Sequence, residues 1–318
     1  MFNKYNILGD THGRPTWKNL VIEDGKNIFT GDYFSPYNKE YSYEDCKNNF
    51  LQIIDFKIKH PETELLIGNH DEDHWNLLGK TQMCRHDYKN ANEINQIFEE
   101  HRELFTMAVS IDNEYLVTHA GVSMPWYYNA INNTMVQFIL LPNGSKENYY
   151  NNIDEAISAY SKSNSLLVSF EDRLKKDSIL FFKNEWYEYK KGKAFKINKL
   201  TPDEVSKNIN EIWKKDPFAF SFEKCAAFYD TYGNSITQSP AWIRPDELNI
   251  ANIFKATEYH QIVGHTMFED IKCFSSKIWD DNLCQYVDSK NKSELIFVDC
   301  LETKEKSYII SKNNSIDD

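Results

Sequence analysis

The sequence lacks the features of a membrane or secreted protein. No apolar run approaches the roughly 20 residues that a membrane-spanning helix needs. The segment from Met1 to Leu8 carries one lysine and leads directly into a strand-like pattern, which is unlike a signal peptide. The six cysteines are scattered without a Cys-x-x-Cys pair, which disfavours a zinc knuckle, and a chain of this length does not need disulfides. We therefore expect a cytoplasmic protein with reduced thiols and no membrane partner.

Positive charge is also scarce. The 36 lysines and arginines are outnumbered by 48 aspartates and glutamates, which gives a formal net charge of −12. An acidic surface repels nucleic-acid backbones, so we expect no nucleic-acid partner. Hydrophobic residues make up 41% of the chain and charged residues 26%, which is ordinary for a folded globular protein. The 318 residues are therefore enough for one large domain whose core can hold a preorganised site.

Much of the chain alternates strand and helix signals. Apolar residues at helical spacing, such as Phe50, Ile53 and Ile54, predict a helix over 43–60 that Pro61 ends. This alternation indicates a mixed α/β fold. A second helix is predicted over 92–105, and short strands over 5–9, 26–30, 64–67, 115–117, 261–263, 271–275, 295–298 and 308–310.

The region 127–230 has a different composition. It is rich in lysine, asparagine, tyrosine and glutamate, and it has helical stretches over 152–161 and 202–214. We predict a helical insertion within a single domain spanning 1–318, and it is either a cap over the functional site or a peripheral decoration. The run from Tyr187 to Lys193 reads as a solvated face rather than a binding stripe.

Several of the predicted strands end at a polar residue beside a glycine. Ligands of α/β sheets bind at the carboxyl ends of strands, so residues placed this way are either turn formers or site residues. Taken singly, a Gly-Asp pair is more often a turn and a lone histidine is more often structural. A whole series of such strand ends is hard to obtain from turn propensity alone. The segments are Gly9-Asp10-Thr11-His12-Gly13, Gly31-Asp32-Tyr33, Gly68-Asn69-His70-Asp71, Thr118-His119-Ala120-Gly121 and Val263-Gly264-His265-Thr266.

The residue types in these segments suit a site for two divalent metals. Two such ions ~3.5–4 Å apart need a bridging carboxylate and a mixed shell of oxygen and imidazole ligands. Asp32 is the natural bridge, and Asp10 and His12 are spaced so that both can face one metal. Such a pair lowers the pKa of a bridging water and holds phosphoryl oxygens for in-line attack. The second metal would draw on the side chains of Asn69, His119 and His265.

Together the segments resemble the GDxHG, GDxxDRG, GNHE/D, HAG and GHT blocks of the calcineurin-like metallophosphoesterases. They are most similar to the phosphoprotein phosphatase branch, which includes bacterial and phage-type serine/threonine phosphatases and diadenosine tetraphosphatase. The residue after Thr266 is Met267, so the last block carries one histidine rather than two, which favours this branch. The blocks run from residue 9 to residue 266, so the resemblance spans most of the chain.

The resemblance implies a fold, a cofactor and a set of roles. The fold would be the four-layer αββα sandwich of this superfamily, of the α/β (α+β) class. Two divalent ions would be bound, with Mn²⁺ expected and Fe, Zn or Ni able to occupy the same ligands. His70 would be the general acid, and Arg244, in a Trp-x-Arg-Pro segment, would bind the substrate phosphate or else form an ordinary ion pair. Metal ligands would be Asp10, His12 and Asp32 for the first ion, and Asp32, Asn69, His119 and His265 for the second.

The second block departs from the family pattern. Ser35 stands where the family has an aspartate that polarises the general acid, and Pro36 stands where it has a phosphate-binding arginine. Asp71, Asp73 or another acidic residue could replace the first, and Arg14 or a residue of the insertion could replace the second. With the metal ligands present, we expect activity, with a different substrate or a slower rate.

The leading prediction is hydrolysis of phosphomonoesters by a metal-bridging hydroxide, as in a serine/threonine protein phosphatase. Its partner would be a phosphorylated protein or a small phosphoester. One alternative is a dinucleoside polyphosphate hydrolase, in which Trp126, Tyr127 or Tyr128 would stack on a base, although core or cap packing is the commoner use of such residues. Another is a catalytically silent metal-binding interaction module. The native metals, the oligomeric state and the physiological substrate stay open.

Overall fold

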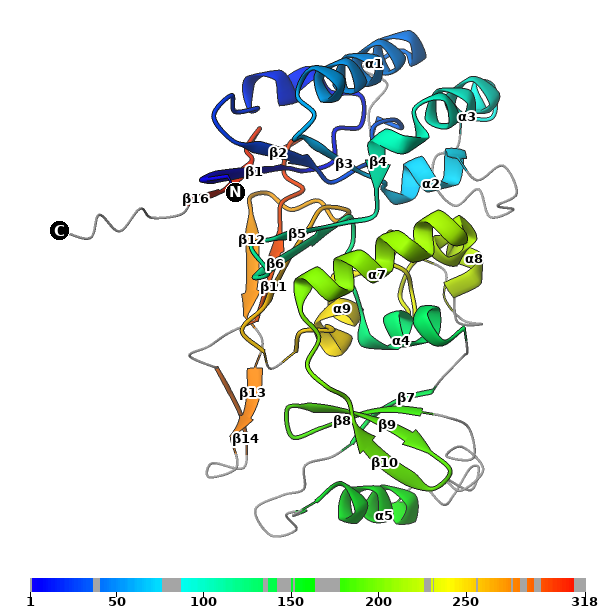
Figure 1. Cartoon of the computed structure of the whole chain (residues 1–318), viewed down its shortest axis with the longest axis vertical. Coiled ribbons are helices and arrows are strands. Elements are labelled where there is room, and N and C mark those ends of the chain that lie inside the picture. Colours follow the sequence, from blue (N-terminus) through cyan, green and yellow to red (C-terminus); the bar gives the residue numbers. More distant parts are fainter. Residues whose placement is uncertain are drawn as a thin grey trace, which may run out of the picture.

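The structure is a computed structural model that describes residues 2–36, 41–75, 87–133, 137–141, 150, 152–163, 178–225, 230, 232–255, 257–275, 277–280, 285–288 and 293–311. Over these residues the chain is a mixed α/β protein built on two five-stranded mixed sheets (Figure 1). Beside them stand a four-stranded sheet and a two-stranded ribbon, which pairs β13 (Lys277–Asp280) with β14 (Gln285–Asp288). No helix in these ranges is long and apolar enough to span a bilayer.

The first sheet has the strand order β16-β1-β2-β3-β4. Strands β1 to β4 run parallel, and β16 pairs antiparallel with β1 at the edge. The helix after β2 begins at Ser42, which forms a capping box with Asp45 and so satisfies donors of the first turn. The elements are β1 (Lys4–Leu8), β2 (Lys26–Phe29), β3 (Glu64–Leu66), β4 (Phe105–Thr106), β16 (Tyr308–Ser311), α1 (Tyr43–Lys59) and α3 (Ala91–Glu100).

The second sheet has the order β12-β15-β11-β6-β5. The central strand β11 runs parallel to both of its neighbours, and the two edge strands are antiparallel to theirs. All of the strands predicted from the sequence are confirmed to within about two residues. The strands are β5 (Ala108–Ile111), β6 (Tyr115–Thr118), β11 (His260–Val263), β12 (Lys272–Ser275) and β15 (Glu294–Phe297).

The two large sheets pack face to face through alternate residues of their strands. On β1, Ile7 points toward the second sheet, whereas Leu8 points into a different cluster with α1. Period-two alternation in the strands therefore separates an inter-sheet core from a helix-facing core. The inter-sheet core contains Tyr5, Ile7, Ile28, Leu66, Val109, Ile111, Val117, Ile262, Ile296 and Val298.

Helices cover the outer faces of both sheets. Phe50 and Ile53 of α1 and Phe98 of α3 belong to one buried cluster with Leu8 and Phe29 of the first sheet. On the second sheet, α7 (Pro202–Lys215) packs against β5 and β6, while Leu248 of α9 (Pro245–Ala251) contacts a cluster that includes Val263. The carboxyl ends of the parallel strands are thereby held in a rigid frame.

Within 127–230 the structure differs from the helical insertion expected from the sequence. This region contains a four-stranded sheet of order β10-β9-β8-β7, with α5 (Ile153–Ser163) packed on one face through Ala156 and Ile157. The Lys, Glu and Tyr content of β9 and β10 concealed those two strands. We call this sheet and α5 the small-sheet lobe. Its strands are β7 (Gln137–Leu140), β8 (Ser178–Phe182), β9 (Glu185–Lys190) and β10 (Lys193–Lys196).

Helix α7 belongs to the main frame rather than to the small-sheet lobe. The Asn210 side-chain oxygen accepts hydrogen bonds from the Thr106 hydroxyl at 2.7 Å and from the Met107 and Ala108 N–H groups at 3.0 and 3.1 Å. Its amide nitrogen donates to the Ala108 carbonyl at 2.8 Å. One asparagine therefore satisfies the backbone between β4 and β5, where the chain passes from one sheet to the other.

The described cysteines bear on the predicted redox state. Cys46, Cys225, Cys273 and Cys300 carry free thiols, and burial raises the pKa of the Cys225 thiol to about 12. Such buried thiols are inert rather than nucleophilic. Cys84 and Cys284 lie outside the described residues.

Candidate metal centre

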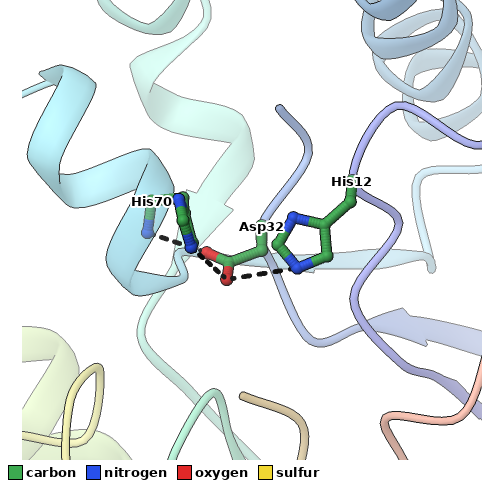
Figure 2. Close-up of side chains that lie close together, drawn as sticks. All are labelled: His12, Asp32 and His70. Atoms are coloured by element: carbon green, nitrogen blue, oxygen red, sulfur yellow. Dashed lines mark hydrogen bonds and ion pairs between the residues drawn. The ribbon is translucent and has the colours of Figure 1, made fainter. Parts of the chain in front are cut away.

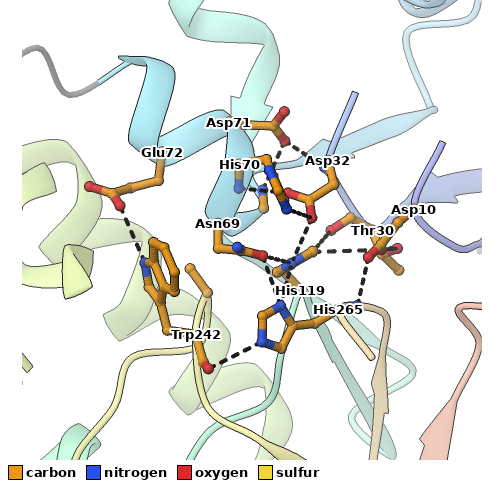
Figure 3. A network of polar contacts seen from close by, with 12 residues as sticks. Asp10, Thr30, Asp32, Asn69, His70, Asp71, Glu72, His119, Trp242 and His265 are labelled. Atoms are coloured by element: carbon orange, nitrogen blue, oxygen red, sulfur yellow. Dashed lines mark hydrogen bonds and ion pairs between the residues drawn. The ribbon is translucent and has the colours of Figure 1, made fainter. Parts of the chain in front are cut away.

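The predicted ligand residues lie together at the carboxyl ends of five strands. Asp10 follows β1, Asp32 follows β2 and Asn69 follows β3, while His119 follows β6 and His265 follows β11. Because β1 to β3 are parallel, and β6 is parallel to β11, the ends of each set meet at one edge. Figure 3 shows these side chains pointing toward one another from both sheets.

The backbone turns sharply at three of the predicted ligands. His12, Asp32 and His265 have φ values of 44°, 53° and 63°, in the left-handed region that residues other than glycine seldom adopt. Such conformations persist only where the surroundings enforce them, and they gather at functional sites. Here they turn side chains at the strand ends inward rather than along the sheet.

Two glycines are required by close approach to the ligands. A Cβ on Gly68 would lie 2.1 Å from the Asp32 Oδ1 atom, and a Cβ on Gly264 would lie 2.2 Å from the Asp10 Oδ1 atom. Both distances are far below van der Waals contact. The glycines that precede Asn69 and His265 therefore make room for the carboxylates.

The tautomers of three histidines follow from their backbone contacts. Nδ1 of His12 lies 3.0 Å from the Phe34 carbonyl oxygen, and Nδ1 of His119 lies 2.8 Å from the Thr30 carbonyl oxygen. Nε2 of His265 lies 3.1 Å from the Trp242 carbonyl oxygen. A carbonyl can only accept, so each of these nitrogens donates, and the opposite ring nitrogen carries a lone pair.

Those lone pairs face other lone pairs. Nε2 of His119 lies 2.9 Å from the Asn69 Oδ1 atom, 3.2 Å from Nδ1 of His265 and 3.5 Å from the Asp32 Oδ2 atom. Nδ1 of His265 is also 2.8 Å from the Asn69 Oδ1 atom. Electron-rich atoms crowded in this way repel one another unless a cation lies among them. The donor set of imidazole nitrogens, a carboxylate and an amide oxygen fits a divalent metal.

Asp32 is the carboxylate shared by the groups around it. Its Oδ2 atom lies 3.9 Å from Nε2 of His12 and 4.0 Å from Nε2 of His70 (Figure 2). The same atom also contacts His119. Its Oδ1 atom accepts a hydrogen bond from the backbone N–H of His70 at 2.9 Å. Two groups able to hold a metal ion share it, namely His12, Asp32, His70 and Asp10, Asp32, His119. Asp32 is therefore placed as a bridging carboxylate would be.

The electrostatics of the cluster favour an added positive charge. Burial raises the pKa of Asp10 well above its ordinary value, and the neighbouring carboxylates Asp299 and Asp32 raise it further. Burial lowers the pKa of His119 to about 3 and holds that of His265 well below its usual range, with a contribution from the charge of Arg244. The imidazoles of His119 and His265 are thus neutral, as metal ligands must be, and the carboxylates around Asp10 repel one another.

Asp71 has a structural role that was not expected. Its carboxylate accepts hydrogen bonds from the backbone N–H groups of Asp32, Tyr33 and Gly68, at 2.6, 2.9 and 3.0 Å. It therefore ties α2 (Asn69–Trp75) to the turn after β2 and fixes the backbone of Asp32. This use of both oxygens argues against Asp71 as the replacement partner of His70.

The two arginines considered for phosphate binding have different surroundings. The Arg14 guanidinium is buried and pairs with Glu302 at 2.7 Å, so it is committed elsewhere. Nε of Arg244 donates to the Tyr232 carbonyl at 2.9 Å, and its charge acts on the pKa values of His119 and His265. Arg244 thus stands beside His119 and His265, whereas Arg14 acts on Asp299, where burial raises the pKa and the charge of Arg14 opposes that rise.

Sequence reasoning missed several residues around the cluster. Thr30 donates its hydroxyl to Asp10 at 2.9 Å and also orients His119 through its carbonyl. Asp299 is 3% exposed and its Oδ2 atom has no hydrogen-bond partner among the described residues, yet its charge acts on Asp10. Asp299 follows the strand predicted over 295–298, so the same strand-end pattern would have identified it.

Comparisons with known proteins give a partial match. No protein-family model matches the chain. It is 32% identical over 128 residues to "Serine/threonine-protein phosphatase T" of Saccharomyces cerevisiae, which covers 37% of this chain and 23% of that protein. It is 31% identical over 124 residues to "Serine/threonine-protein phosphatase with EF-hands 1" of Rattus norvegicus, covering 37% of this chain and 19% of that protein. The chain thus spans less than a quarter of the length of these relatives.

A solved structure gives a similar result. A protein serine/threonine phosphatase from Saccharomyces cerevisiae with similarity to human phosphatase PP5 is 30% identical over 37% of this chain and 38% of its own, with a TM-score of 0.28. Taken together, the sequence matches amount to a distant and partial homology to serine/threonine phosphatases.

Proposed function

We propose that this chain is a metal-dependent phosphoesterase that hydrolyses phosphomonoesters, of the serine/threonine protein phosphatase type. The observation that carries the proposal is the convergence of lone-pair atoms from four residues, His119, His265, Asn69 and Asp32. In His119, His265 and Asp32 the other polar atom of the side chain is hydrogen-bonded to a backbone group. The partial homology to serine/threonine phosphatases supports the choice of a phosphoester as substrate.

Two divalent cations, with manganese the first to test, would be held by residues of this edge. When bound, such a pair supplies Lewis-acid charge for the phosphoryl group and lowers the pKa of a water molecule. Asp32 would serve both ions, because its Oδ2 atom is the one that the surrounding imidazoles share. The first ion would use Asp10, His12 and Asp32, and the second Asp32, Asn69, His119 and His265.

His70 and Arg244 would handle the substrate itself. His70 stands in the first turn of α2 with its ring edge-to-face against His12, and its Nε2 atom faces the shared carboxylate. From there it can give a proton to the leaving oxygen. Arg244, held by the Tyr232 carbonyl, offers its remaining guanidinium N–H groups to a phosphate. With Arg14 paired to Glu302, Arg244 would be the principal phosphate clamp.

The packing of the two large sheets between helices supports the four-layer αββα sandwich as the architecture. We also propose that residues 127–230 are an insertion within a single domain spanning 1–318. Its small-sheet lobe lies at the opposite end of the long axis from α1 and α3, well away from α2 (Figure 1). That placement supports a peripheral role for the lobe rather than a cap over His70.

No observation favours the alternative functions more strongly. Trp126 and Tyr127 are 2% and 5% exposed, and their polar atoms contact the Ala219 carbonyl and the Asn208 side chain. They are core residues, so they do not supply the base-stacking surface that a dinucleotide hydrolase would need.

The test is hydrolysis of p-nitrophenyl phosphate by chelator-stripped protein, with and without added Mn²⁺. We expect turnover to return with the metal and to be absent in His119→Ala, while His101→Ala, a histidine remote from the cluster at the end of α3, stays active. Turnover should then be compared between phosphopeptides and dinucleotides. Protein that binds two metals but turns over none of these substrates would contradict the proposal and favour a silent binding module.

A further inference from the structure

The β9–β10 hairpin of the small-sheet lobe carries the densest positive charge described in this acidic chain. The hairpin, residues 185–196, contains four lysines, Lys190, Lys191, Lys193 and Lys196, and its only acidic residues are Glu185 and Glu188 on β9. Those two glutamates pair with Lys196 and Lys190. Lys191 and Lys193 are exposed and form no ion pair among the residues that the structure describes.

Strand β10 is an edge of its sheet. Its one neighbour among the described strands is β9, in the register Lys193↔Lys190 and Phe195↔Glu188. Lys191 and Gly192, with φ values of 49° and 78°, form the tight turn between the two strands. An edge strand presents unpaired backbone groups that another extended chain can use.

The register identifies which backbone groups point outward. Ile197 donates its N–H to the Trp186 carbonyl at 2.8 Å, so the pairs hydrogen-bonded to β9 are those at 197, 195 and 193. In an antiparallel ladder the alternate residues direct their N–H and C=O groups away from the neighbour. On β10 these residues are Ala194 and Lys196.

The side chains around this edge favour an acidic, partly apolar partner. Phe195 is 52% exposed on β10, where it would meet the side chains of an added strand. Lysines on an edge prevent pairing with a second copy of the same edge, since the two copies carry like charge. The same lysines attract a strand rich in aspartate or glutamate.

We propose that the open edge of β10 is a docking site for an acidic, extended polypeptide segment, which adds to the sheet as a further strand. The backbone of Ala194 and Lys196 supplies the hydrogen bonds, and Lys191 and Lys193, which form no ion pair among the described residues, supply the charge selectivity. A polypeptide fits this edge better than a nucleic acid, because only a peptide backbone matches the row of N–H and C=O groups. The site lies far from the metal centre, so this inference does not depend on the proposed function.

The test is fluorescence anisotropy of the whole chain with a short labelled peptide in which glutamate alternates with valine. We expect saturable binding, and no binding of the matching lysine–valine peptide. The double variant Lys191→Glu, Lys193→Glu should weaken affinity by about tenfold or more. Its matched control is Lys207→Glu, Lys214→Glu on the exposed surface of α7, which makes the same change in net charge and should leave affinity unchanged.

A second variant separates strand addition from diffuse attraction. Ala194→Pro removes one outward N–H without altering charge or the hydrogen bonds to β9, because proline is tolerated at this position of an edge strand. It should weaken peptide binding severalfold while leaving the circular dichroism spectrum unchanged. Equal affinity in Ala194→Pro would overturn the proposal, as would tighter binding of a single-stranded oligonucleotide or self-association of the chain through this edge.

Discussion

The candidate metal centre and the β9–β10 hairpin differ in how their charged groups are brought together. In the candidate metal centre, the backbone N–H of His265 donates to the Asp10 carboxylate across 255 positions of sequence, and both groups are buried. In the hairpin, Lys196 pairs with Glu185 across 11 positions, with both side chains exposed. The first arrangement exists only when both large sheets are complete. The second needs one turn and two strands.

This difference has consequences for how substitutions act. A buried carboxylate among lone pairs has no water to compensate for a change, so small alterations should have large effects on binding and activity. An exposed pair in water contributes little, because solvent screens the charges. Comparable substitutions in the two regions should therefore differ greatly in effect.

The largest effect is expected for Asp32→Asn. Loss of the shared charge should remove the metal pair and lower phosphoesterase turnover by at least about a thousandfold. Elemental analysis and p-nitrophenyl phosphate hydrolysis measure the two quantities. Glu185→Gln in the hairpin is the matched control, and it should keep both the metals and the activity. Full metal occupancy in Asp32→Asn would contradict the role of Asp32 as the shared metal ligand.

His70→Ala should leave metal content unchanged and slow hydrolysis by about 10²–10⁴-fold for esters with poor leaving groups. Esters with good leaving groups need less protonation, so their hydrolysis should slow much less. The measurement is kcat across a series of aryl phosphates of rising leaving-group pKa. A uniform loss across the series would assign His70 to metal binding, which its place in the group with His12 and Asp32 also allows.

Gly68→Ala should lower turnover by roughly a hundredfold, because the added methyl displaces the Asp32 carboxylate. Gly192→Ala in the hairpin turn is the counterpart: nothing lies within 4 Å of its added Cβ, and only the positive φ of 78° opposes it. That variant should lose about 1 kcal/mol of unfolding free energy and keep full turnover. Equal activities of the two variants would show that close approach at Gly68 does not matter.

Arg244→Lys should raise KM for a phosphomonoester by about tenfold while changing kcat less, since lysine keeps the charge but loses the planar fork of donors. Steady-state kinetics separates the two constants. Arg102→Lys, on an exposed 3-10 turn, should match the wild-type values. An unchanged KM would indicate that Arg244 has only a structural role, as a hydrogen-bond donor to the Tyr232 carbonyl.

The smallest effect on catalysis is expected from Asn210→Ala in α7. It leaves the Met107 and Ala108 N–H groups without their acceptor and should cost about 2 kcal/mol of unfolding free energy. Because no ligand is touched, turnover of the folded protein should be unchanged. Chemical denaturation provides the measurement, and an unchanged midpoint would place α7 outside the main frame. Because α7 begins at Pro202 and belongs to the main frame, a variant that lacks the small-sheet lobe should keep the chain from Pro202 onward.

The sequence indicated the metal centre better than it indicated the lobe. Strand ends at Asp10, Asp32 and Asn69 follow short apolar strands and adjacent glycines, so their pattern is readable without any knowledge of long-range contacts. Their convergence was an inference from parallel strands. The structure brings these predicted side chains together, although their role as metal ligands stays a prediction.

The elements that were missed lacked a readable period. Helix α2 is buried along its whole length although its sequence, Asn-His-Asp-Glu-Asp-His-Trp, is almost entirely polar. The sequence therefore has no apolar residues at helical spacing, and it looked like a turn. In β9, Tyr187 and Tyr189 alternate with Glu188 and Lys190, and the run from Tyr187 to Lys193 was interpreted as a solvated face. The backbone carbonyls that fix the imidazoles, such as those of Thr30 and Trp242, have no sequence signature at all.

The most direct test of the central claim is anomalous diffraction from crystals of the protein grown with Mn²⁺, measured at the manganese edge. The account predicts two peaks about 3.5–4 Å apart, with the Asp32 carboxylate between them and His119 and His265 contacting one of them. A single peak away from Asp32, or an intact cluster that binds no manganese, zinc or iron, would contradict it.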